Sequence, residues 1–180
     1  MTQIVVAPAS APALDPFAQI IDALSDENTY YPYQPHRLWR GMSGHTVTGA
    51  EIAEHLDATL ALLEAKGWHR YSTDDEDVDV AESASVRDML KAVIRLLGGN
   101  RTPGYTLREA LFEARYTEHG DTDTWSAAGR CLEAIIATQA GTICTDYGAW
   151  SERRGRTFDD VRALLAFAAE FARRHGPEGR

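Results

Sequence analysis

Apolar residues recur along most of this chain at the spacing of an amphipathic α-helix. Phe17, Ile20, Ile21 and Leu24 occupy positions i, i+3, i+4 and i+7, so they share one side of a helix. The same period returns in five later segments, and no segment of comparable length alternates convincingly with period two. The pattern therefore predicts six helices, which begin near Asp15, Thr48, Ser85, Thr106, Asp123 and Thr157.

Polar signals mark the ends of these predicted helices. Thr48 and Thr106 are each followed three residues later by a glutamate, and Thr157 is followed at the same spacing by an aspartate. In such a capping box the hydroxyl and the carboxylate accept hydrogen bonds from backbone N–H groups that the start of a helix leaves unpaired. Gly67 and Gly141 follow two of the apolar stripes, and glycine commonly ends a helix at that position.

These elements predict an all-α fold, a single-domain bundle of about six helices with two aromatic-rich connectors. We expect the domain to cover residues 15–176, with a flexible alanine- and proline-rich tail at 1–14 and a disordered end at 177–180. The connectors are residues 26–47 and 142–156. Because the first is longer than structureless loops in compact domains usually are, a short hairpin or a single helical turn inside it fits the pattern.

The first connector is a candidate binding surface. It places Tyr31, Tyr33 and Trp39 among two prolines and two arginines. Tyrosine, tryptophan and arginine dominate the residues that contribute most to protein–protein binding. The alternative, which we favour, is that this segment covers one end of the bundle.

The second connector holds a group of arginines directly before the last predicted helix. Trp150, Arg153, Arg154, Arg156 and Thr157 are called here the arginine loop. The first turn of a helix presents backbone N–H groups with partial positive charge, so a carboxylate or phosphate could bind there beside the guanidinium groups. The alternative, which we again favour, is that the arginines pair with neighbouring acidic residues or project into water.

Charge and composition narrow the classes of partner. The formal net charge of the 180 residues is −9, which disfavours binding to nucleic acid or to anionic membranes. No apolar run approaches the roughly 20 residues that span a bilayer, so no membrane association is expected. The start of the chain lacks the features of a secretory signal, and Cys131 and Cys144 are too few for a disulfide scaffold. These observations favour a cytoplasmic location with free thiols.

Known catalytic and metal-binding motifs do not match the sequence. An acidic run begins near Asp74, but a calcium loop that starts at Asp75 would place Val80 and Val86 where glycine and glutamate are required. No C-x-x-C, H-x-x-x-H or H-E-x-x-H spacing occurs, and no G-x-S-x-G elbow is present. We therefore predict no catalytic residues, no metal and no cofactor, and the question of enzymatic activity stays open.

An aromatic–polar–acidic turn and an Arg-Thr pair precede the apolar stripe of the last predicted helix. The residues concerned are Trp150-Ser151-Glu152, Gly155-Arg156-Thr157, Val161 and Leu164-Leu165, and Leu62-Leu63 and Gly67-Trp68 lie upstream. In these residues the chain resembles an uncharacterised domain family of actinobacteria and of their phages and plasmids, in which such a turn opens a final amphipathic helix. The resemblance covers about two-thirds of the chain, toward the C-terminus, and implies a home on a mobile element. It implies no activity and no site residues.

These observations favour a non-enzymatic regulatory or adaptor protein that acts by binding another protein. The negative charge, the aromatic connectors and the lack of a coherent catalytic set support this hypothesis. Self-association into a homo-oligomer stays open. The alternative is a protein or enzyme that binds a small anionic ligand at the arginine loop.

Overall fold

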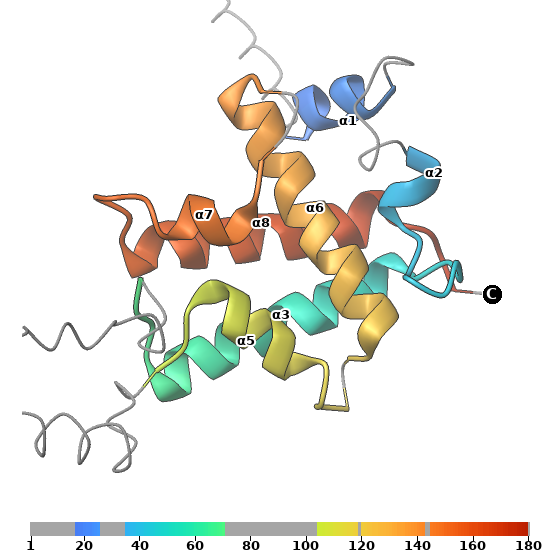
Figure 1. Ribbon diagram of the computed structural model, residues 1–180. Coiled ribbons are helices and arrows are strands. Elements are labelled where there is room, and N and C mark those ends of the chain that lie inside the picture. Colours follow the sequence, from blue (N-terminus) through green and yellow to red (C-terminus); the bar gives the residue numbers. More distant parts are fainter. Residues whose placement is uncertain (1–16, 26–34, 71–103, 119, 143–144, 180) are drawn as a thin grey trace, which may run out of the picture.

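The computed structural model describes residues 17–25, 35–70, 104–118, 120–142 and 145–179 (Figure 1). Within these ranges the chain is an all-α bundle, as predicted, and its only β-structure consists of isolated β-bridges. The helices are α1 (Ala18–Ser25), α2 (Pro35–Leu38), α3 (Gly49–Lys66), α5 (Leu107–Ala114), α6 (Thr122–Ala140), α7 (Tyr147–Ser151) and α8 (Phe158–His175). Several predictions lie outside the described residues: the tail 1–14, Tyr31, Tyr33, the acidic run, the helix near Ser85, and Cys144.

Two long helices, α3 and α8, pack together at the centre of the bundle, and α6 lies across them (Figure 1). The predicted helices that the structure describes turn their apolar stripes toward one another, because this removes the large aliphatic and aromatic side chains from water. The largest completely buried side chains include Ile52, Leu56, Leu132, Ile135, Leu165 and Phe171. Shorter helices then close the core, with α5 on α3, and α7 on α5 and α6.

The predicted capping boxes are confirmed. At the start of α3 the Thr48 backbone N–H donates to the Glu51 carboxylate over 2.7 Å, and Glu51 N–H donates back to the Thr48 hydroxyl. Thr106 begins α5 in the same way, with a reciprocal pair to Glu109. Gly67 and Gly141 also lie at the ends of helices, and both have positive φ, which glycine adopts without steric cost.

Both connectors contain local structure. In the first, α2 is followed by a turn that an isolated antiparallel bridge between Arg40 and Thr46 closes. In the second, Tyr147–Ser151 form α7, which the sequence did not predict. Asp146 caps α7 by accepting a hydrogen bond from Ala149 N–H at 2.7 Å. The two connectors therefore contribute packed elements to the bundle.

The end of α8 returns to the start of α3. Gly49 N–H donates to the Pro177 carbonyl over 2.9 Å, so the residues after α8 lie against the first turn of α3. A Cβ atom on Gly49 would lie 2.1 Å from the Ala172 carbonyl oxygen, closer than any real contact, so the packing requires glycine there. Among the described residues, no helix is long and apolar enough to cross a membrane.

Candidate functional site

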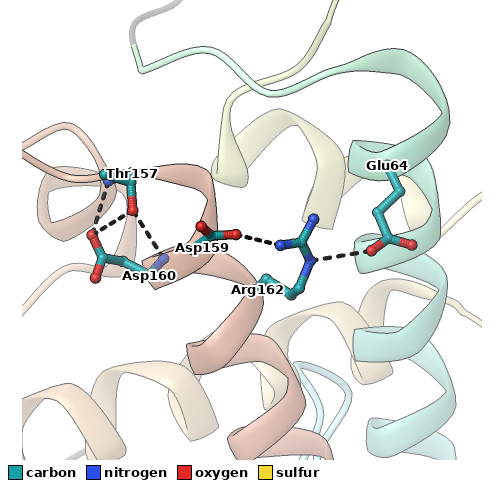
Figure 2. A network of polar contacts seen from close by, with 5 residues as sticks. All are labelled: Glu64, Thr157, Asp159, Asp160 and Arg162. Atoms are coloured by element: carbon teal, nitrogen blue, oxygen red, sulfur yellow. Dashed lines mark hydrogen bonds and ion pairs between the residues drawn. The ribbon is translucent and has the colours of Figure 1, made fainter.

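The carboxylate of Asp160 caps the N-terminal end of α8 (Figure 2). The backbone N–H and the hydroxyl of Thr157 both donate to Asp160, at 2.9 and 3.0 Å, and Asp160 N–H donates back to the Thr157 hydroxyl at 3.3 Å. The hydrogen bond from the Thr157 backbone, together with that from its side chain, lowers the pKa of Asp160 below its ordinary value. The capping box therefore pairs the backbone N–H groups of Thr157 and Asp160 within the protein itself.

Within the arginine loop, Arg156 covers an indole ring. Its guanidinium carbon lies 3.9 Å from the centre of the Trp150 ring, and only 8% of Trp150 is exposed. Arg156 also lies 4.0 Å from the Asp160 carboxylate, and its carbonyl accepts a hydrogen bond from Arg70 at 3.1 Å. These contacts hold Arg156 over the edge of the core.

The other charged side chains near the start of α8 differ in whether they form ion pairs. Arg153 and Arg154 are exposed, and their guanidinium groups form no ion pair with another described residue. Asp159 pairs instead with Arg162 on the next turn of α8, and Arg162 also reaches Glu64 of α3 at 3.3 Å (Figure 2). The structure thus brings Trp150, Arg156 and Thr157 together as packing and capping groups, while Arg153 and Arg154 stay at the surface.

Trp39, the described member of the first predicted surface, packs against the core. Its ring is half-buried and stacks on Phe171 of α8 with 5.9 Å between ring centres. Its carbonyl accepts a hydrogen bond from Val47 N–H at 2.8 Å. Trp39 is therefore part of the packing at this end of the bundle, while Tyr31 and Tyr33 lie outside the described residues.

A different group of aromatic residues lies open at the surface. Phe112 on α5, Arg115 and Tyr116 directly after it, and Trp125 on α6 form what we call the aromatic–arginine surface. Phe112 is 39% exposed and Tyr116 is 69% exposed. Helices α5 and α6 contact each other, which brings Trp125 to the other three residues although it follows them on a separate helix.

Close ring contacts fix this surface. The guanidinium carbon of Arg115 lies 3.5 Å from the centre of the Phe112 ring and 4.4 Å from that of Tyr116. Phe112 meets the rings of Trp125 and Tyr116 edge to face, with centre distances of 5.6 and 6.0 Å. Arg115 also donates a hydrogen bond to the Tyr116 hydroxyl. The side chains therefore support one another while two of the rings face water.

Sequence reasoning missed this surface, although a signal was present. Phe112 and Tyr116 are four residues apart, a spacing that places two side chains on one side of a helix, and Tyr116 follows the end of α5 by two residues. That side differs from the stripe of Leu107, Ala110, Leu111 and Ala114, which are all completely buried. Aromatic residues placed off the buried stripe of an amphipathic helix would have indicated an exposed apolar patch.

The described residues contain no group of three or more histidine, cysteine, aspartate or glutamate side chains that could hold a metal ion. Burial raises the pKa of the Cys131 thiol to about 12, so this cysteine stays protonated and is a poor nucleophile. The buried His55 ring has Nε2 3.1 Å from the Leu111 carbonyl, to which it donates, and so links α3 to α5.

Comparison with known proteins places the chain in a family. Residues 47–171, from just before α3 to near the end of α8, match the model of a family of unknown function, DUF6197. This range confirms the expectation that the C-terminal two-thirds belong to an uncharacterised family. No curated protein and no solved structure matches the chain. The chain is a member of the DUF6197 family of unknown function.

Proposed function

We propose that this chain is a non-enzymatic adaptor or regulatory protein that binds another protein through the aromatic–arginine surface. One observation carries the proposal. Three large hydrophobic side chains are exposed among the described residues, and two of them, Phe112 and Tyr116, are neighbours there. Contiguous exposed apolar groups commonly mark sites of protein binding, because water leaves them when a partner covers them.

Two properties of this surface favour protein recognition: its residue types and the fixed positions of its side chains. Aromatic residues and arginine are enriched at interfaces, and they contribute much of the binding energy. The contacts of Arg115 with Phe112 and Tyr116 hold the rings in place before any partner arrives. A surface that is already ordered loses less side-chain entropy on binding.

The arginine loop offers less support for the alternative of an anionic ligand. Asp160 already accepts the hydrogen bonds of Thr157 at the start of α8, and Arg156 already lies over Trp150. A phosphate or carboxylate would have to compete with that carboxylate. Of the three arginines in this loop, Arg153 and Arg154 are exposed and could meet such a ligand.

The proposal is tested by comparing two double variants. An affinity-tagged chain is incubated with lysate of the source organism, and the retained proteins are measured by quantitative mass spectrometry. Phe112→Ala/Tyr116→Ala should lose the specifically retained protein, because it removes the exposed rings. Arg153→Ala/Arg154→Ala removes two exposed side chains of the arginine loop and should retain it. The reverse result would assign recognition to the arginine loop, and equal retention by both variants would reject the aromatic–arginine surface.

The amino-acid usage also bears on the origin of the gene. The chain has only two lysines, Lys66 and Lys91, against sixteen arginines, which is typical of a GC-rich genome. We propose an actinobacterial mobile element as its home, in agreement with the resemblance noted above. Neighbouring genes for phage or plasmid functions would support this, and a conserved chromosomal setting would contradict it.

A further inference from the structure

Most arginines that lie over an aromatic ring in the described part of the chain also pair with a carboxylate. Arg108 illustrates the arrangement, because its guanidinium carbon lies 5.4 Å from the centre of the Tyr147 ring and its Nη2 lies 2.7 Å from the neighbouring Asp146 carboxylate. The ring attracts the cation on one side, and the carboxylate accepts its hydrogen bonds on another. The same combination of ring and carboxylate occurs at Arg156 (Trp150, Asp160), Arg162 (Phe158, Glu64) and Arg174 (Phe17, Glu170).

Arg115, in the aromatic–arginine surface, has the rings but no carboxylate. Its guanidinium carbon lies 3.5, 4.4 and 5.9 Å from the ring centres of Phe112, Tyr116 and Trp125. It forms no ion pair with any residue that the structure describes. Its Nε atom is buried without a hydrogen-bond partner, and its Nη2 atom donates to the Tyr116 hydroxyl. The Nη1 atom is therefore the donor that an incoming acceptor can reach.

A partner that covers the two exposed rings also covers this guanidinium group. Arg115 contacts both Phe112 and Tyr116, so a protein surface laid on these rings takes water from its Nη atoms as well. Removing a charged group from water is costly unless an acceptor replaces the lost hydrogen bonds. A carboxylate replaces them with charge-assisted hydrogen bonds, and its two oxygens match the planar guanidinium group. Charge complementarity at Arg115 therefore favours a partner with a carboxylate at this point.

The acidic residues of the chain limit how much negative charge such a partner can carry. The formal net charge is −9, and Glu113 and Glu118 are exposed close to Arg115 in the sequence. Neither glutamate forms an ion pair with Arg115. Charges farther apart than about 8 Å are largely screened at physiological ionic strength, whereas a carboxylate in contact with Arg115 is not. The local charges therefore favour one carboxylate among apolar residues over a run of acidic residues.

We propose that the aromatic–arginine surface binds a partner segment that presents one aspartate or glutamate to Arg115 and places apolar side chains on Phe112 and Tyr116. The carboxylate of the partner would complete at Arg115 the arrangement that Asp146 completes at Arg108 within the fold. The apolar side chains beside it would remove the two exposed rings from water. The inference rests on the proposed function, and it adds the chemistry of the partner.

Selection from a library of random peptides displayed on phage tests this inference. The full chain is immobilised, and we expect the selected peptides to carry an aspartate or glutamate beside apolar residues. Selection on Arg115→Gln, which removes the charge and keeps a polar side chain, should lose this preference. Selection on Arg154→Gln, which removes an exposed arginine of the arginine loop, should keep it. The inference is overturned if the chain selects no acidic peptides, or if Arg115→Gln selects them as well as the unaltered chain does.

A selected peptide then tests the charge pair itself in a double-mutant cycle. Fluorescence anisotropy should show binding roughly tenfold or more weaker when the acidic residue of the peptide is replaced by its amide. This half of the cycle uses the unaltered chain, so it does not depend on the folding of a variant. Arg115→Gln should weaken binding of the original peptide by a similar factor, and the amide peptide should lose little more in that variant because both changes remove one contact. Losses that simply multiply would place the carboxylate elsewhere and overturn the inference.

The lysate experiment separates this inference from the proposed function. If Phe112→Ala/Tyr116→Ala loses the retained protein while Arg115→Gln keeps it, only the inference is overturned. If retention does not depend on Phe112 and Tyr116 while the peptide cycle shows coupling to Arg115, the carboxylate site is supported and the proposed recognition through the two rings is rejected.

Discussion

Two regions of this molecule place an arginine against aromatic rings, but the rings are buried in one region and exposed in the other. In the arginine loop, Arg156 lies 3.9 Å from the centre of the Trp150 ring, which is 8% exposed. In the aromatic–arginine surface, Arg115 lies 3.5 Å from the centre of the Phe112 ring, and Phe112 and Tyr116 remain open to water. The first pair seals the core, while the second holds rings where a partner can reach them.

The difference comes from the elements that carry the rings. Trp150 belongs to α7, which packs on α5 and α6 and turns the indole inward. Phe112 lies on the outer side of α5, away from the buried stripe. Residue types alone therefore do not identify a binding surface in this protein. The direction in which the helix turns the ring decides between packing and recognition.

The largest effect is expected from Trp150→Ala. It removes a buried indole, so we expect the free energy of unfolding to fall by about 3–5 kcal/mol. Urea denaturation followed by circular dichroism measures this change. Arg156→Ala is the matched comparison, and it should cost about 1 kcal/mol because it removes the covering cation but keeps the ring. A loss of less than 1 kcal/mol for Trp150→Ala would show that the ring does not support the core.

A smaller effect is expected from Thr106→Ala, which removes the cap of the helix that presents Phe112. The hydroxyl accepts the Glu109 N–H at 3.1 Å, and the loss of such a cap costs about 1 kcal/mol. Denaturant unfolding measures the cost, and Thr106→Ser, which keeps the hydroxyl, serves as the control. Equal destabilisation by both substitutions would contradict the capping role.

On the exposed side of the comparison, Phe112→Ala/Tyr116→Ala should change stability only slightly. Both rings are partly in water, so we expect a loss of about 1 kcal/mol or less, together with loss of partner retention. Thermal unfolding measures the stability of this variant, and the lysate experiment on the same preparation measures its retention of the partner. A destabilisation as large as that of Trp150→Ala would place these rings in the core and remove the contrast between the regions.

The smallest effect concerns pH at the start of α8. Hydrogen bonds from Thr157 hold the pKa of Asp160 in the folded chain below its value in the unfolded chain. The stability that this carboxylate contributes is therefore present above the unfolded-state pKa and is lost as the pH falls through the folded-state pKa. Carboxylate NMR titration measures the shift, and Thr157→Ala should move the pKa of Asp160 upward. An unchanged pKa in that variant would contradict the side-chain hydrogen bond.

Much of the fold follows from local sequence signals. The caps at Thr48, Thr106 and Thr157 and the glycines at 67 and 141 appear where expected, because each depends on residues within one turn. Helix α7 was missed because five residues are too few to show a helical period. Its cap, Asp146, also pairs with Arg108, a residue 38 positions away that local patterns do not connect to it.

The site was harder to predict than the fold. The residues of the arginine loop are adjacent in sequence, yet the position of Arg156 depends on contacts with Asp160 and with Arg70, which is 86 residues away. The aromatic–arginine surface joins α5 to Trp125 on α6, so its full extent appears only in three dimensions. The two exposed rings, Phe112 and Tyr116, could have been predicted from their spacing of four residues on the polar side of the helical segment.

Photocrosslinking tests the central claim most directly. A photoreactive phenylalanine analogue replaces Tyr116 in one preparation and Ala166, on the exposed side of α8, in another, and both are irradiated in lysate of the source organism. We predict a discrete adduct with one protein at position 116 and none at position 166. The absence of an adduct at position 116, or the same adducts at both positions, would contradict the assignment of recognition to the aromatic–arginine surface.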